Sequence, residues 1–182
     1  MVVTIKPQLM KDGTTKLKAE SPYHPDFPVG ARKLGGKWNP TSKAWYFDLR
    51  DEERVRTLCT AVYGTDGTVA DAEDLVTVRP TLGGTYWSFD HELWAFGRRL
   101  AVRRERDYAV SLGDGVIVVE GDFMESGGSR KNPRITLATA TVVLEIRDVP
   151  ALLVEKDRAR FGDALIITGD IPATFRQALS GE

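Results

Sequence analysis

The segment YGTDGTVADAED, residues 63–74, most constrains how this chain of 182 residues can fold. It is small, glycine-containing and acidic and has no hydrophobic period, whereas the sequence on each side of it is regularly patterned. Clusters of glycine and polar residues mark loops between folded segments. We therefore predict two domains, at residues 1–64 and 75–182, joined by a linker at residues 65–74.

The first domain is predicted to contain a strand, a helix, a hairpin and a second helix. TTKLKAESP alternates polar and apolar residues as an exposed strand does, and PDFPVGARKLGG carries apolar residues at helical spacing before Gly35. KWNPTSKAWYFDL is typical of two short strands joined by a turn at Asn39 and Pro40. DLRDEERVRTLCTAVYG has an acidic first turn and one apolar face, and this helix should end at Gly64.

The second domain is predicted to be rich in antiparallel strands. Short alternating or apolar runs indicate these strands, with LGDG as a hairpin turn between the fourth and fifth: LVTVRPTL, TYWSFDHELWAF, RRLAVRR, DYAVSL, GVIVVEGDF and RITLATATVVLEI. VPALLVEKDRARFG is expected to be a helix, DALIITG a strand and PATFRQALS a terminal helix. The predicted fold class is α+β: a small strand-helix-hairpin-helix module followed by an antiparallel β-rich domain with a C-terminal helix.

Composition limits the functions that the chain can have. It contains no run of about 18 apolar residues, so we expect no membrane span, and its N-terminus lacks the apolar core of an export signal. The expected location is cytoplasmic. One cysteine, Cys59, excludes an intramolecular disulfide, and only two histidines are available for metal or acid-base chemistry. We expect no metal site, no cofactor and no enzymatic activity.

Four acids in the second domain leave one enzymatic alternative open. Glu120, Asp122, Glu145 and Asp148 lie on or beside predicted strands, loosely as in a divalent-metal nuclease. Such nucleases carry a lysine two residues after an acid, where this chain has Arg147. Solvated strand ends explain these acids better.

Charge is distributed unevenly along the chain. The net charge is −1, which gives no overall attraction to nucleic acid. Residues 1–64 nevertheless hold 11 Lys and Arg against 7 Asp and Glu, whereas residues 65–182 hold 14 against 19. The basic part of the chain is therefore the part that contains the aromatic hairpin.

The aromatic residues of the hairpin alternate between its two faces. Trp45 and Phe47 should point to one face and Ala44 and Tyr46 to the other, and both faces of so small a sheet cannot be core. Exposed rings beside cations suit unpaired bases and their phosphates. The predicted nucleic-acid-binding side chains of this region are Trp38, Trp45 and Tyr46 for stacking and Arg32, Lys33, Lys37 and Lys43 for phosphate contacts. The alternative is that the tryptophans and Phe47 fill the module's only core behind solvated lysines.

Residues 22–58, PYHPDFPVGARKLGGKWNPTSKAWYFDLRDEERVRTL, resemble the HARP domain of annealing helicases and the small HARP-like modules of phage and plasmid proteins. The pattern is a glycine-rich turn, Trp followed by Asn-Pro, a short polar turn ending in Lys, and a Trp-x-Phe strand. The residues that match it are Gly36, Trp38, Asn39, Pro40, Lys43, Trp45 and Phe47. The resemblance implies recognition of branched or forked DNA, without an ATPase, and origin in a phage or other mobile element.

Two further basic segments lie in the second domain. In GRRLAVRRERDY, residues 97–108, a strand would turn Arg99 and Arg103 outward as phosphate contacts, or the charges would protect a sheet edge from pairing with another chain. The patternless loop MESGGSRKNPR, residues 124–134, places Arg130 and Lys131 where they would order on a polyanion or stay solvated in a mobile loop.

The sequence therefore favours a non-enzymatic accessory protein that binds single-stranded or branched DNA, or RNA. Its second domain would add a contact surface or bind a protein partner. The alternative function is a protein-interaction module, such as an inhibitor of a host defence complex or a subunit of an assembly. Trp87 and Trp94 in the acidic second domain would suit such an interface.

Overall fold

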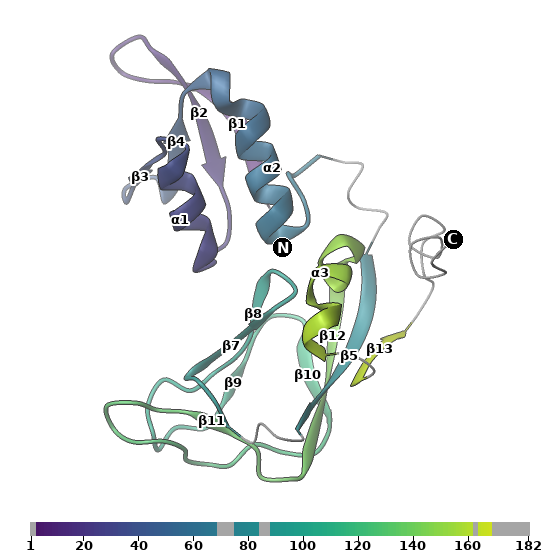
Figure 1. Cartoon of the computed structure of the whole chain (residues 1–182). Helices are drawn as coiled ribbons and strands as arrows, with labels where there is room; N and C mark the ends of the chain where they lie inside the picture. The colour runs from purple at the N-terminus through teal and green to yellow at the C-terminus, as the bar shows by residue number, and fades with distance from the viewer. Residues whose placement is uncertain (1–2, 69–74, 84–87, 162–163, 169–182) are drawn as a thin grey trace. The chain divides into compact units, whose positions relative to one another are not determined.

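The chain divides into two compact units, Met1–Ala72 and Glu73–Glu182 (Figure 1). This computed structural model describes residues 3–68, 75–83, 88–161 and 164–168. Helices and predominantly antiparallel strands occur in both units, so the protein is of the α+β class and strand-rich, as predicted. Among the described residues, none of the helices is long and apolar enough to cross a membrane.

The N-terminal unit is an antiparallel sheet with two helices packed on one face (Figure 1). The strand order is β1-β2-β4-β3, so β1 and β3 form its edges. Both helices lie where the sequence predicts them. The elements of this unit are β1 (Thr4–Leu9), β2 (Thr15–Glu20), α1 (Asp26–Lys33), β3 (Lys37–Asn39), β4 (Ala44–Phe47), the 3-10 helix η1 (Leu49–Asp51) and α2 (Glu52–Tyr63).

Alternation along the strands decides which side chains face the helices. Leu17 and Ala19 of β2 and Trp45 and Phe47 of β4 all point to the same side, because directly paired residues of antiparallel strands share a face. These side chains are buried against apolar residues of both helices. The helical side chains in this core are Phe27, Ala31, Val55, Cys59, Val62 and Tyr63. The opposite face of the sheet therefore carries the polar side chains of the strands.

Two glycines determine the backbone conformation of the connection between α1 and β3. Gly35 has a φ of +71°, and the amides of Gly35 and Gly36 donate to the carbonyls of Arg32 and Ala31 at 3.0 and 2.9 Å. This is the hydrogen-bond pattern of a Schellman cap. A Cβ on Gly36 would lie 2.8 Å from the Ala31 carbonyl oxygen and would also overlap the ring of Phe47. The close approach of β3 to the core therefore requires glycine at position 36.

Cys59 is expected to resist thiol reagents in the folded chain. Its side chain is fully buried, and burial raises the pKa of the thiol to about 12 from an ordinary value of 9.0. The thiolate is the reactive form, so a shift of this size leaves roughly 1000-fold fewer reactive groups near neutral pH. Labelling with a disulfide reagent should be slow in buffer and fast in concentrated guanidinium chloride. Equal rates in the two solvents would contradict the burial of Cys59.

The described residues of the C-terminal unit form three antiparallel sheets of different sizes. The largest has the strand order β10-β12-β5-β13, and the others are β7-β8-β9 and the pair β11-β6. The elements of this unit are β5 (Leu75–Gly83), β6 (Ser88–Phe89), β7 (Glu92–Ala95), β8 (Arg98–Val102), β9 (Ser111–Leu112), β10 (Val116–Glu120), β11 (Ile135–Thr136), β12 (Thr141–Pro150), α3 (Ala151–Phe161) and β13 (Leu165–Thr168).

Two local predictions for this unit are wrong. The LGDG segment does form a turn, in which the Val116 amide donates to the Gly113 carbonyl at 3.2 Å. It does not close a hairpin, however, because β9 pairs with β8 whereas β10 pairs with β12. The single strand expected over residues 85–96 is divided into β6 and β7 by Asp90 and His91. The predicted terminal helix at residues 172–180, Trp87, and positions 69–74 of the predicted linker lie outside the described residues.

Candidate nucleic-acid interface

The outer face of the N-terminal sheet carries a row of lysines around one tyrosine. Lys6 pairs with Lys18, Lys18 with Tyr46, and Tyr46 with Lys37, so these four residues cross all four strands on one face. Trp45 and Phe47 flank Tyr46 in β4 and point the other way, into the core. The ring of Tyr46 is therefore half-buried in a basic surface rather than in the core.

A hollow of about 400 Å³ lies at the β3 end of this row. The residues that line it come in part from β2, β3 and β4, among them Lys16, Lys37, Trp38 and Tyr46. The Trp38 side chain is 50% exposed, but Trp38 pairs with Trp45 and its ring lies on that side of the sheet, with 5.7 Å between the two ring centroids. The structure thus places Tyr46 and two lysines on the outer face at the hollow, with the exposed Trp38 ring on the other face of the same edge strand.

Ion pairs neutralise only part of the lysine row. Lys18 Nζ lies 2.7 Å from Glu20 Oε1, and Lys6 Nζ lies 3.9 Å from the other oxygen of the same carboxylate. The hydrogen bond to Lys18 lowers the pKa of Glu20, and the bond to Glu20 raises the pKa of Lys18. Within the described part of the chain, neither Lys16 nor Lys37 has an acidic side chain within 4.0 Å. Lys16 and Lys37 therefore remain without a close ion pair in that part of the chain, although Asp12 and Asp48 interact with Lys16 at longer range.

Burial corrects the prediction that Trp45 is a stacking surface. Trp45 is only 7% exposed, since Phe27 packs edge-on at 6.3 Å and the Arg32 guanidinium group lies 5.8 Å from the Trp45 ring centroid. A buried ring has no face to offer to a base. Of the two tryptophans in the hairpin, Trp38 alone is placed to stack on a ligand, because it lies on the edge strand.

The β3–β4 turn holds Trp38 beside the hollow. Asn39 Oδ1 accepts hydrogen bonds from the amides of Thr41 and Ser42 at 2.9 and 3.2 Å, which closes the turn. Lys43 completes the turn in the left-handed region, with a φ of 49°. The Tyr46 hydroxyl donates to Ser42 Oγ at 3.3 Å, so the turn also fixes the end of the tyrosine ring.

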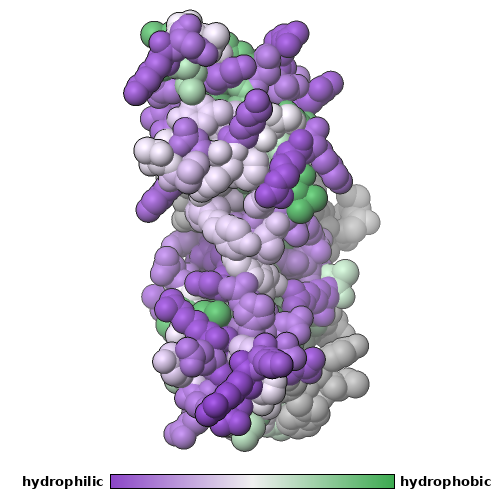
Figure 2. Space-filling view, turned by 90° about the vertical axis from the view of Figure 1, so that its left-hand side faces the viewer, coloured by the Kyte–Doolittle hydropathy of each residue, from purple (hydrophilic) through white to green (hydrophobic). Residues whose placement is uncertain are grey.

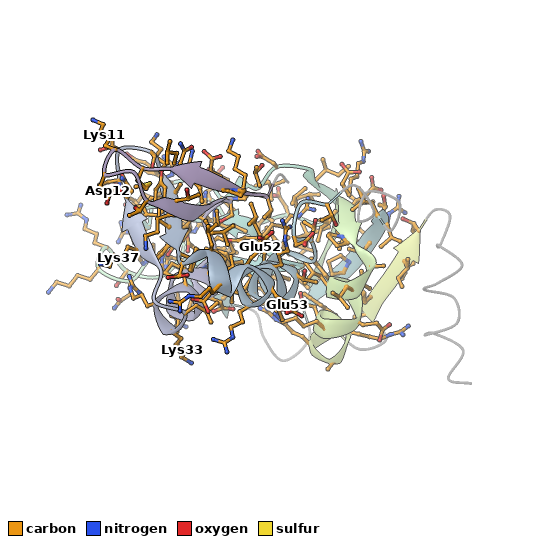
Figure 3. All side chains as sticks on the ribbon, turned by 90° about the horizontal axis from the view of Figure 1, so that it is seen from above. Lys11, Asp12, Lys33, Lys37, Glu52 and Glu53 are labelled. Atoms are coloured by element: carbon orange, nitrogen blue, oxygen red, sulfur yellow. The ribbon has the colours of Figure 1, made fainter. Side chains whose placement is uncertain are left out.

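The other predicted cations of this region are placed apart from the hollow. Arg32 and Lys33 are in the last turn of α1, on the helical side of the sheet, and Arg32 covers Trp45. Lys33 and Lys37 project from different sides of the unit, and Lys37 lies towards the side of Lys11 and Asp12 (Figure 3). Lys43 is exposed at the turn but does not line the hollow.

Sequence reasoning missed Lys6, Lys16 and Lys18. A usable signal was present, because the alternation in TTKLKAESP puts Lys16 and Lys18 on one face, opposite Leu17 and Ala19. That pattern does not reveal which strand β2 pairs with. The pairing of Lys18 with Tyr46 is what brings these lysines to the aromatic hairpin.

The prediction that Arg103 faces outward is wrong. Its side chain is fully buried, and its guanidinium group donates to backbone carbonyls, including those of Arg134 at 2.7 Å and Glu125 at 2.8 Å. Met124, Tyr108 and Arg106 supply further carbonyl acceptors. Burial lowers the pKa of Arg103. Arg103 therefore ties loops of the C-terminal unit together and is inaccessible to a ligand.

Arg99, Arg130 and Lys131 have separate environments. Arg99 is paired with Glu92 across β7 and β8, with 2.8 Å between Nη1 and Oε1. Arg130 and Lys131 are both exposed at the tip of the 124–134 loop. Accordingly, Arg99 already has an anionic partner, whereas the loop residues extend into solvent.

The acids considered for a nuclease do not gather into one site. Glu145 lies between Arg79 and Arg147, at 2.7 and 3.0 Å, and these hydrogen bonds lower the pKa of Glu145. Asp122 accepts a hydrogen bond from the Phe123 amide at 2.7 Å. Among the described residues, no group of three or more His, Cys, Asp or Glu side chains could hold a metal ion.

Comparisons with models of protein families, with curated proteins and with solved structures found no significant match to this chain. The function is therefore inferred from the residues of the site. Hydrophilic side chains cover most of the face shown in Figure 2, with hydrophobic residues scattered among them. The hollow beside Trp38 combines cationic, aromatic and aliphatic lining residues.

Proposed function

We propose that residues 1–64 are a HARP-like module that binds single-stranded or branched nucleic acid, DNA or RNA. The chain would be a non-enzymatic, cytoplasmic accessory factor of a phage or other mobile element, with the strand-rich second domain as an additional contact surface. The observation that supports binding most strongly is the hollow lined by Lys16, Lys37 and Tyr46, at an edge strand that also carries the half-exposed ring of Trp38. The matches at Gly36, Trp38, Asn39 and Pro40 to the HARP pattern extend the proposal to forked DNA.

The lysines of the hollow and the exposed ring on the same edge strand have separate roles in this proposal. An unpaired base stacks on the open half of Trp38, a contact that contributes about 1–3 kcal/mol in single-strand-binding proteins. Lys16 and Lys37 neutralise the adjacent phosphates, and neither must first break an ion pair to do so. Bases in a blunt duplex are already stacked on one another. The expected order of affinity is therefore single-stranded or forked nucleic acid above blunt duplex.

Lys37→Ala is expected to weaken binding of a single-stranded thymidine oligonucleotide about tenfold at low salt. The plot of the logarithm of affinity against that of salt concentration should lose about 0.7 of its slope, the value for one phosphate contact on a single strand. Fluorescence anisotropy of the labelled oligonucleotide, titrated at several salt concentrations, measures both quantities.

Lys33→Ala provides the matched comparison, because it removes the same charge from the same unit but from α1. It should leave the slope unchanged. Equal losses of affinity and slope in the two variants would show that binding depends on the overall positive charge of the unit. That result would contradict binding at the hollow. A wild-type chain that retains no single-stranded or forked oligonucleotide at low salt would overturn the proposed function.

An exposed sheet edge favours the alternative function, a protein-interaction module. β10 is an edge strand of the four-stranded sheet of the C-terminal unit, and its Ile117 and Val119 side chains are 45% and 47% exposed. An edge with aliphatic side chains is a template for pairing with another chain. Trp94, in contrast, is half-buried and donates to Glu92 at 3.0 Å. A partner recovered together with the chain and lost in Val119→Lys, with no oligonucleotide binding, would support this alternative.

A further inference from the structure

The C-terminal unit contains a second hollow, of about 530 Å³, that the proposed function does not use. One wall is the segment of Asp90 and His91 between β6 and β7, and the other is the turn at residues 128–134. The Ile135 amide donates to the Asp90 carbonyl at 3.3 Å, which joins the two walls. All of the lining residues belong to one compact unit, so the hollow is a feature of that unit's own fold.

Hydrogen bonds hold the turn in one conformation. The amides of Ser129 and Asn132 donate to each other's carbonyls at 2.9 and 3.2 Å, and Gly128 has a φ of +77°. The Arg134 amide donates to the Gly127 carbonyl at 3.0 Å, and buried Arg103 holds the Arg134 carbonyl from inside the unit. A ligand therefore meets a loop whose backbone is already ordered, which reduces the entropy lost on binding.

The charged groups around this hollow favour an anion. Lys131 and Arg134 line it, and in the described residues no carboxylate lies within 4.0 Å of either one. Among the described lining residues Asp90 is the only acid, and Ser129, Asn132 and His91 add further hydrogen-bonding side chains. A guanidinium group paired with an ammonium group and flanked by hydroxyl and amide donors matches the several oxygens of a phosphate.

We propose that this hollow is a phosphate-binding site, which takes either a phosphomonoester or a phosphodiester of a polynucleotide backbone. Arg134 presents its planar group to two phosphate oxygens, and Lys131 supplies a point charge from the middle of the turn. The site is independent of the hollow in the N-terminal unit, because no residue is shared between the two.

The test follows backbone amide signals of the isotope-labelled full chain by NMR during titration with inorganic phosphate, with sodium chloride at matched ionic strength as the control. The chain carries Lys37→Ala, so that failure at the N-terminal site and failure here are distinguishable. Saturable shifts are expected at Gly128, Ser129 and Asn132. Adding Lys131→Gln and Arg134→Gln together should raise the apparent dissociation constant at least about tenfold.

Arg130→Gln is the matched control, because Arg130 lies in the same turn but does not line the hollow. It should leave the phosphate titration unchanged. Shifts that do not saturate, that chloride reproduces, or that Arg130→Gln abolishes as fully as the double substitution would overturn the site.

A second titration identifies the source of the phosphate. A thymidine oligonucleotide without terminal phosphates contains only diesters, so the same shifts with this probe would support a polynucleotide backbone as the ligand. Shifts with inorganic phosphate and not with the oligonucleotide would support a monoester. Absence of shifts with both probes would contradict the proposal.

Discussion

Replacing Arg103 with methionine is expected to lower the free energy of unfolding of the C-terminal unit by about 3–5 kcal/mol, the typical cost of removing one member of a buried polar network. Arg103 is fully buried and donates to the carbonyls of Tyr108, Met124, Glu125 and Arg134. Methionine fills much of the same space but has no donor, so these carbonyls would be left unpaired. Denaturation of the full chain, followed by far-ultraviolet circular dichroism, measures the loss.

Arg104→Met provides the control for charge, because Arg104 is the exposed neighbour of Arg103. Its effect should stay within about 0.5 kcal/mol, as is usual for surface substitutions. Labelling of Cys59 should be unchanged in Arg103→Met, which would place the damage in the C-terminal unit. Equal destabilisation by the two methionine variants would show that the carbonyl network contributes nothing to stability.

The burial of Arg103 could not be predicted from GRRLAVRRERDY. Strict alternation would turn Arg103 away from Val102, but the structure buries Leu100, Ala101, Val102 and Arg103 in succession. β8 ends at Val102, so the period of two no longer applies at position 103. The carbonyls that accept from Arg103 belong to loops up to 31 residues away. No local pattern encodes contacts of that kind.

More of the N-terminal unit could be predicted from the sequence, but its strand pairing could not. Its helices follow apolar spacing and glycine stops that act locally, at Gly35 and Gly64. β1 was missed because Pro7 disfavours a strand, and the structure accommodates it at a sheet edge. The hollow depends on register, since Lys16 lies far from Trp38 in sequence and reaches the same site through the pairing of β2 with β4. The composition of the hairpin predicted a basic and aromatic site, whereas the pairing of the strands determines which residues line it.

Replacing each hairpin tryptophan separately with alanine is expected to change two different properties, the affinity for the oligonucleotide in one variant and the stability of the unit in the other. Trp38→Ala should weaken oligonucleotide binding by about 1–3 kcal/mol, the range for one base stacked on a ring. It should cost little stability, because half of Trp38 is exposed and its main ring contact is with Trp45. Trp45→Ala should instead destabilise the N-terminal unit by about 3–5 kcal/mol, as removal of a buried tryptophan does.

The conservative variants keep this comparison interpretable if Trp45→Ala fails to fold. Trp38→Phe retains a stacking ring and should recover most of the affinity lost in Trp38→Ala, whereas Trp45→Phe retains buried apolar surface and should fold and bind. Anisotropy and thermal unfolding of the four variants give the two quantities separately. Unchanged affinity in a folded Trp38→Ala would mean that no base stacks on the exposed ring, because phosphate contacts by Lys16 and Lys37 do not require the indole. Loss of affinity in a stable Trp45→Phe would mean that the ligand depends on the packing of Trp45 with Arg32 and not on the exposed ring of Trp38 alone.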